Sequence, residues 1–293
     1  MASTLQEAIF YTLSYADIFD YPLTLQELTR YLIGLSTTES AVKAALIDLS
    51  DFPETNGYYT LPGRTSLVAL RRRREQVARA LWPYALKYGR LIARLPFVRM
   101  VAVTGALPVH NVEPGDDIDY LIVTASGHVW MTRLFVVQLV VKPAARRRHE
   151  VCPNFFLAEH AMALTEHDLF HAHELTQMVP IYGLGVYEAF RAANTWTAAF
   201  LPNASGPPRV DTVSHDRPKA CRTLIEFPLH NPIGKWIEQR EIARMQAKLR
   251  HSVELGQGSD SAEVVLSPDR CKGHIRPHAH MTQTAFSARL KQD

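Results

Sequence analysis

Cysteine is scarce in this chain of 293 residues, which holds three, far apart and without a Cys-x-x-Cys pair. A sparse, odd set argues against a disulfide framework and indicates a reducing compartment, so we expect a cytoplasmic protein. The chain also does not begin with a basic segment followed by an apolar one, which is the pattern of a signal peptide.

Long apolar runs and a strong net charge are missing as well. The most apolar stretch, residues 129–141, is interrupted by Arg133 and Gln138 and is too short to cross a bilayer, so no membrane partner is expected. Basic residues outnumber acidic ones by 32 to 29, an excess too small to predict nucleic-acid binding by itself. A hydrophobic content of 47% and this length allow two domains with a sizeable core.

The most informative stretch predicts a strand, a glycine turn, a loop and a second strand. The apolar, β-branched run from Val98 to Val103 is followed by Thr104 and Gly105. A polar loop with two prolines comes next, and a second apolar run covers residues 120–123. Such runs bounded by turn residues are typical of buried strands.

Two aspartates, Asp117 and Asp119, open the second of these strands. Residues two apart in a strand point to the same face, so we expect their carboxylates side by side. Adjacent carboxylates repel each other unless a cation neutralises them, and hard oxygen ligands so placed suit Mg²⁺. The alternative is a pair of solvated aspartates at the end of a core strand.

A glycine followed twelve residues later by Asp-x-Asp, with apolar strands around both, resembles the nucleotidyltransferase superfamily that includes DNA polymerase beta. The resemblance implies an α+β fold, a mixed sheet flanked by helices, and a nucleoside triphosphate substrate. It implies that Gly105, between Thr104 and Ala106, lets the phosphates approach the backbone. It also implies that Asp117 and Asp119 are catalytic and bind the Mg²⁺ ions that activate the attacking hydroxyl and steady the leaving pyrophosphate.

Two departures from the family pattern leave two functions open. The family has serine where this chain has Ala106, and it carries a third carboxylate on a strand that we predict at residues 151–157. This strand offers Asn154, with Glu150 at its edge, so the third carboxylate would be Glu150, Glu159 or a distant residue. The first hypothesis is a metal-dependent enzyme that moves a nucleoside monophosphate to an unknown acceptor. The second is a catalytically inactive, nucleotide-binding or regulatory protein.

Residues 1–75 predict a small helical module of winged helix-turn-helix type. Thr24 and Glu27 form a capping box, a third helix is expected over residues 39–49, and residues 57–61 indicate a short strand. Winged helices dock a helix in the DNA major groove. The expected recognition helix has a lysine and two acidic residues but no arginine, which favours a packing or dimerising module, and hence a homo-oligomer, over DNA binding.

The remaining segments complete the expected organisation. A basic helix over residues 64–94 connects the module to a nucleotidyltransferase-like domain at 76–202; its run Arg71–Arg74 is expected on a solvated face, and Pro83 is expected to kink or divide it. Another helix is expected over 161–182, with His167 and His171 exposed on one face. A linker and a helical C-terminal region fill 203–293. This order resembles a group of bacterial nucleotidyltransferase-domain proteins.

Overall fold

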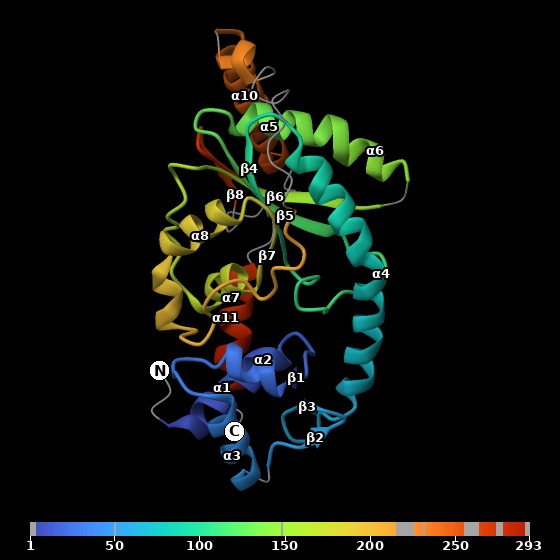
Figure 1. Cartoon of the computed structure of the whole chain (residues 1–293), viewed down its shortest axis with the longest axis vertical. Coiled ribbons are helices and arrows are strands. Elements are labelled where there is room, and N and C mark those ends of the chain that lie inside the picture. Colours follow the sequence, from blue (N-terminus) through green and yellow to red (C-terminus); the bar gives the residue numbers. More distant parts are fainter. Residues whose placement is uncertain are drawn as a thin grey trace.

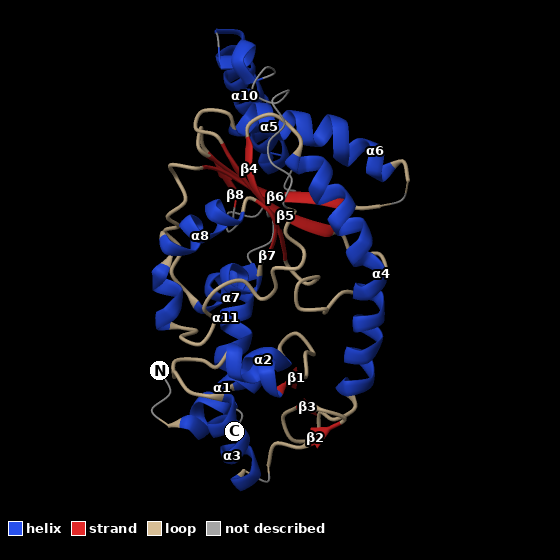
Figure 2. Ribbon diagram, viewed as in Figure 1, coloured by secondary structure: helices blue, strands red, loops and turns tan. Residues whose placement is uncertain are grey.

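Six strands form the central sheet of the computed structural model, which describes residues 4–49, 51–147, 149–214, 226–230, 232–254, 264–273 and 278–290 (Figures 1 and 2). Neighbouring strands are antiparallel except for β5 and β6, which are parallel, so the sheet is mixed and the chain is α+β. In spatial order the strands are β7 (Val179–Tyr182), β4 (Val98–Thr104), β5 (Ile118–Thr124), β6 (Val151–Ala158), β9 (Arg270–Gly273) and β8 (Val264–Leu266).

The predicted strands around Gly105 and the predicted strand at 151–157 are confirmed as β4, β5 and β6. Their apolar runs are buried on both faces of the sheet, which explains why they lack a polar–apolar alternation. The parallel pair β5–β6 needs a crossover connection, and a helical segment supplies it. This crossover consists of α5 (Val129–Val136), the π-helical turn η1 (Val137–Val141) and α6 (Lys142–Ala145).

Helices cover both faces of the sheet. On one face, α4 (Leu67–Ala93), α5 and α10 (Pro232–Glu254) pack on the largest apolar core. On the other face, α7 (Leu169–Gln177) and α8 (Leu184–Ala192) pack on a second core, followed by the 3₁₀ turn η2 (Thr195–Ala199). The side chain of Asp119 belongs to this second face, because it shares the strand alternation of Leu121 and Val123.

The N-terminal module forms the opposite end of the molecule from the sheet, and α4 runs between the two (Figure 1). A three-stranded sheet, ordered β1-β3-β2, closes the module. Thr24 and Glu27 form the predicted capping box, and Thr38 caps the third helix. The elements are α1 (Leu5–Asp17), β1 (Leu23–Thr24), α2 (Leu25–Arg30), α3 (Glu39–Asp48), β2 (Glu54–Thr55) and β3 (Tyr58–Tyr59).

Two expectations about helices are corrected. The helix expected over residues 161–182 is only α7, because Asp168 caps its start and residues 179–182 pair with β4 as β7. The expected division of the basic helix at Pro83 does not occur: α4 continues through it, since Trp82 and Ala85 on either side are buried in the main core. Tertiary packing here outweighs the hydrogen bond that proline removes.

The C-terminal region contributes strands as well as helices. β8 and β9 extend the sheet beyond β6, and the short turn η3 (Phe227–His230) precedes α10. The final helix, α11 (His278–Arg289), lies beside α7 and α1, where Phe286 makes an edge-on ring contact with Tyr15. In the described part of the chain, no helix combines the length and the apolar character that crossing a membrane requires.

Candidate metal centre

The turn after β4 is built to admit one carboxylate. Gly105 adopts a φ of +71°, in the left-handed region that favours glycine. A Cβ atom at this position would overlap Oδ2 of Asp119, the residue that pairs with Thr104 across the β4–β5 ladder. Glycine is therefore required here by the carboxylate as well as by the backbone, and Ala106 follows it into the loop.

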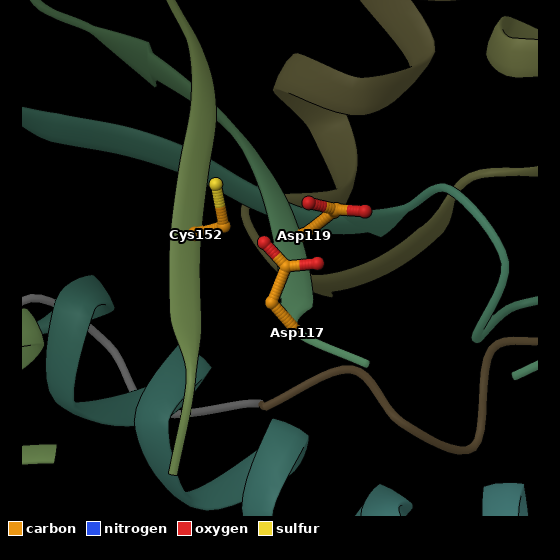
Figure 3. A group of neighbouring side chains, drawn as sticks. All are labelled: Asp117, Asp119 and Cys152. Atoms are coloured by element: carbon orange, nitrogen blue, oxygen red, sulfur yellow. The ribbon is translucent and has the colours of Figure 1, made fainter. Parts of the chain in front are cut away.

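Asp117 and Asp119 lie next to each other, as the strand alternation predicted. One carboxylate oxygen of each, together with Sγ of Cys152, forms a group in which all atoms lie within 4.8 Å of one another (Figure 3). Asp117 is the most exposed of the three residues. Cys152 comes from β6, where it stands directly opposite Asp119 in the parallel ladder.

Asp119 is a partly buried acid whose strongest electrostatic neighbours, among the described residues, are negative. Burial, followed by the negative charges of Asp117 and Glu174, raises the pKa of its carboxyl to about 8, and the hydrogen bond from Asn154 acts in the opposite direction. No lysine or arginine is among the larger influences that the described residues exert on this pKa. A carboxylate so placed is stabilised by a bound cation, which is the usual mark of a functional rather than a structural acid.

A bulge in β6 brings Asn154 to Asp119. The β5–β6 register shifts between Asp119 and Leu121, so that β6 has one residue more than its partner in the interval that contains Pro153. Proline has no N–H for the ladder and is accommodated at such bulges. The amide Nδ2 of Asn154 donates to Oδ1 of Asp119, and the Cys152 thiol donates to Oδ1 of Asn154 at 2.6 Å.

The predicted alternatives for a third carboxylate do not join this group. Glu150 is exposed at the edge of β6, and among the described residues the metal-ligating set contains Asp117, Asp119 and Cys152. Glu159 lies at the far end of the strand, where its backbone N–H donates to the carbonyl of Thr124. The place opposite Asp119 is thus taken by a thiol and an amide.

Two arginines of the basic helix fasten the loop that carries these residues. Arg71, only 2% exposed, donates to the carbonyl of Val109 at 3.1 Å, and Arg74 donates to Glu113 at 2.7 Å. The expectation of a solvated basic run is therefore wrong for these two positions, although Arg72 and Arg73 are exposed. Four consecutive arginines cover a full turn of a helix, so some of them must point inward. This was the signal in the sequence.

A cavity of about 370 Å³ opens beside the carboxylates. The β4–β5 turn, with Thr104, Gly105 and Ala106, forms one part of its wall, and Asp119 and Asn154 form another. The N-terminal module supplies an aromatic wall opposite, whereas α7 and β9 supply charged groups. These further lining residues include Tyr15, Phe19, Tyr21, Tyr31, Glu166, His171, His173, Glu174, Arg270 and Lys272.

The sequence predicts His167 and His171 on one exposed helix face, but the structure separates them. His167 precedes α7 and stacks on Trp196 with ring centroids 4.6 Å apart. His171 is buried, bonds to Asp168 at 2.8 Å through Nδ1 and lies 3.1 Å from Lys272 through Nε2. The two histidines do not share a helix face because α7 begins only after Asp168, which lies between them.

Searches of protein-family models, curated proteins and solved structures found no match to this chain. The function is therefore inferred from the geometry of the site.

Proposed function

We propose that this chain is a nucleotidyltransferase-like protein, in which Asp117 and Asp119 hold a divalent cation together with a nucleoside triphosphate. The observation that carries the proposal is the buried, uncompensated carboxylate of Asp119 beside a second carboxylate and a glycine turn. Carboxylate pairs that bind one cation with substrate phosphates are the common arrangement for Mg²⁺. A bound cation would supply charge stabilisation for the leaving pyrophosphate.

The activity that this arrangement supports best is transfer of a nucleoside monophosphate to an acceptor in the adjoining cavity. Gly105 and Asp119 line the same cavity, and the Asp119 carboxylate occupies the space that a side chain at position 105 would fill. Glu174 on α7 lines that cavity, and its charge raises the pKa of Asp119, so its carboxylate is placed to take a proton from an acceptor hydroxyl.

A second function, nucleotide binding without transfer, is favoured by the composition of β6. Nucleotidyl transfer requires the attacking hydroxyl to be activated while the charge of the leaving pyrophosphate is neutralised. Asn154 is neutral and cannot serve as a base, and it stands where the third carboxylate was expected. One cation site can hold a triphosphate without supplying both requirements.

For the N-terminal module we propose a winged-helix type of fold that serves in packing. Its aromatic side chains form one wall of the cavity, and its Glu27 pairs with Arg71 of α4 at 2.8 Å. Its third helix exposes Glu39, Lys43 and Asp48, a mixed set that does not favour the DNA backbone. We infer that the module shapes the ligand site and does not read DNA.

A thermal-shift panel tests the binding proposal. The four nucleoside triphosphates, each with Mg²⁺ or Mn²⁺, should raise the Tm of the wild type by about 5 °C at saturating concentration. The double variant Asp117→Ala, Asp119→Ala should show no shift, whereas Glu188→Gln, at an exposed position of α8, should behave as the wild type. Absence of any cation-dependent shift in the wild type would refute the proposal.

Pyrophosphate release separates the two functions. Sustained release from purified protein, abolished by Asp119→Asn and by Glu174→Gln, supports transfer. Cation-dependent binding without release, across nucleotides and with hydroxyl-bearing acceptors present, supports the binding protein instead.

A further inference from the structure

We propose that Cys152 is the third protein ligand of the cation at Asp117 and Asp119, and that the resident cation is accordingly Zn²⁺ rather than Mg²⁺. This inference rests on the proposed function for the existence of a cation site, and it goes beyond it by naming the donor set and the ion. The sequence predicts residue 152 only as part of a strand, so it does not connect Cys152 with the two aspartates.

The geometry places the thiol where a shared ion would reach it. Cys152 and Asp119 are opposite each other on adjacent parallel strands, so their side chains leave the same face of the sheet (Figure 3). The candidate ligand atoms of Asp117, Asp119 and Cys152 lie within 4.8 Å of one another. In a tetrahedral zinc site two ligand atoms are about 3.6 Å apart, from Zn–S and Zn–O bonds of about 2.3 and 2.1 Å. Side-chain rotations that close the group by about 1 Å therefore bring all three ligand atoms onto one ion.

The chemistry of the donors decides between cations. Mg²⁺ takes oxygen ligands in an octahedron and does not bind thiolates, whereas Zn²⁺ accepts carboxylate and thiolate together. Three protein ligands with a fourth position open to water or substrate is the usual arrangement of a catalytic zinc ion. On binding, the Sγ–H bond breaks, its proton passes to solvent, and the sulfur lone pair forms the bond to the ion. No electron transfer is involved.

Asn154 supports this arrangement as a positioning residue. Its amide nitrogen holds Oδ1 of Asp119 and its amide oxygen accepts from the Cys152 thiol. The first of these contacts persists when a cation binds, whereas the second orders the thiol only until its proton leaves. Outer partners of this kind orient ligands in metal sites.

The chain provides a matched control in Cys271. This cysteine lies on β9, is 5% exposed and packs in the apolar core on the other face of the sheet. It has the same thiol chemistry, but its charged neighbours are Arg133 and the single carboxylate of Glu241, and it is absent from the metal-ligating set of the described residues. An effect specific to Cys152 cannot be ascribed to a cysteine in general.

Absorption spectroscopy with Co²⁺ as the probe tests the proposal. Co²⁺ replaces Zn²⁺, and a thiolate bond to it gives an intense near-ultraviolet charge-transfer band. The full-length wild type and Cys271→Ser should both show the band with one equivalent of Co²⁺, and Zn²⁺ should displace it. Cys152→Ser should lose the band, and its Zn²⁺ affinity, measured by competition with a chromophoric chelator, should fall at least tenfold. Its Tm without metal shows that it folds.

Three results of the metal-binding experiment would overturn the proposal. Co²⁺ that binds wild type and Cys152→Ser equally, without the band, overturns the thiol ligand and leaves the proposed cation site intact. A band that survives in Cys152→Ser but not in Asp119→Asn assigns the thiolate to another cysteine and also overturns the inference. If neither Co²⁺ nor Zn²⁺ binds while Mg²⁺ with a triphosphate raises the Tm, the ion is Mg²⁺ as first expected.

Discussion

Two charged clusters lie near the junction of the module and the sheet, and they are balanced in opposite ways. Arg71 is surrounded by the carboxylates of Glu27 and Glu75, each within 2.9 Å, by a backbone carbonyl and by the ring of Tyr21, 4.1 Å from its guanidinium carbon. Asp119 has three negative neighbours, Asp117, Glu174 and Asp116, and one amide donor. The first cluster satisfies its charge within the chain, whereas the second keeps an excess of negative charge.

This difference separates a structural from a functional use of buried charge. A buried ion that is fully paired holds segments together, and breaking it is costly because its partners lose their compensation. A buried acid without a partner lowers the stability of the ligand-free protein, and that cost is recovered when a cation binds. Substitutions in the two clusters should therefore change stability in opposite directions.

The largest effect should come from Arg71→Met. Removal of the guanidinium leaves Glu27 and Glu75 uncompensated at a nearly buried site and frees the loop held through Val109. We expect a loss of about 3–5 kcal/mol in the free energy of unfolding, measured by urea denaturation. Arg72→Met, on the exposed side of the same helix, is the control and should change stability by less than about 0.5 kcal/mol. Equal effects at both positions would contradict the structural role of Arg71.

Asp119→Asn should act in the opposite direction. Burial and its acidic neighbours raise the pKa of this carboxyl to about 8, far above the value in the unfolded chain. The native state then binds more protons than the unfolded state, so wild-type stability falls as pH rises from about 4 to 8. The neutral variant avoids this loss and should be more stable by about 3 kcal/mol at pH 8 without metal, and equal at pH 4.

Unfolding free energies measured over a series of pH values test whether Asp119→Asn is the more stable protein at high pH. Addition of a metal ion tests the opposite effect. A saturating divalent cation should stabilise the wild type and leave Asp119→Asn unchanged, which reduces or reverses the difference. If Asp119→Asn is less stable than the wild type at pH 8 in the presence of a chelator, the charge of Asp119 is compensated within the chain.

Gly105→Ala should cost about 2 kcal/mol. Part of this is the positive φ, and part is the overlap of the new Cβ with the Asp119 carboxylate. Gly63→Ala is a matched control, because Gly63 has a φ of +75° and open space around the added Cβ, so it should show the backbone part alone, about 1 kcal/mol. In the Asp119→Ala background the cost at Gly105 should fall to that same value. Equal costs in both backgrounds would show that the carboxylate does not restrict position 105.

The sequence was most informative where local rules govern. The capping box at Thr24, the strands at 98–104 and 118–124 and the adjacency of Asp117 and Asp119 follow from short-range spacing, and all are present. The error at residues 161–182 has a local cause too: four strand residues after a helix share its apolar character, and their pairing with β4 is not written in their own spacing.

Features that join distant segments could not be predicted. Burial of Arg71 depends on Glu27, which lies 44 residues away. The contact of Asn154 with Asp119 depends on a bulge whose only local signal is Pro153. The cavity takes its lining from α1, the β4–β5 turn, β6, α7 and β9, among other segments spread over nearly the whole chain. Their juxtaposition is a property of the packed fold.

Glu238 is an intermediate case between the two clusters, and it gives the smallest effect. It reaches from α10 to the first turn of α5, where its carboxylate accepts from the backbone N–H groups of Trp130 and Met131 at 3.0 and 2.7 Å. Burial raises its pKa to about 7, against the opposing effect of these two hydrogen bonds. The negative charge of Glu238 is therefore partly compensated, by peptide dipoles rather than by a cation.

The raised pKa means that the native state retains a proton that the unfolded state loses between about pH 4.5 and 7. Wild-type stability should fall over this range relative to Glu238→Gln, which does not titrate, by about 1 kcal/mol once partial solvent screening is allowed for. The measurement is the Tm of both proteins at pH 5 and pH 8, with the exposed Glu188→Gln as control. If the Tm of the wild type instead rises relative to that of Glu238→Gln as pH increases, the N-terminus of α5 compensates the Glu238 charge fully. Glu238 would then resemble the fully paired Arg71 and would not be intermediate between Arg71 and Asp119.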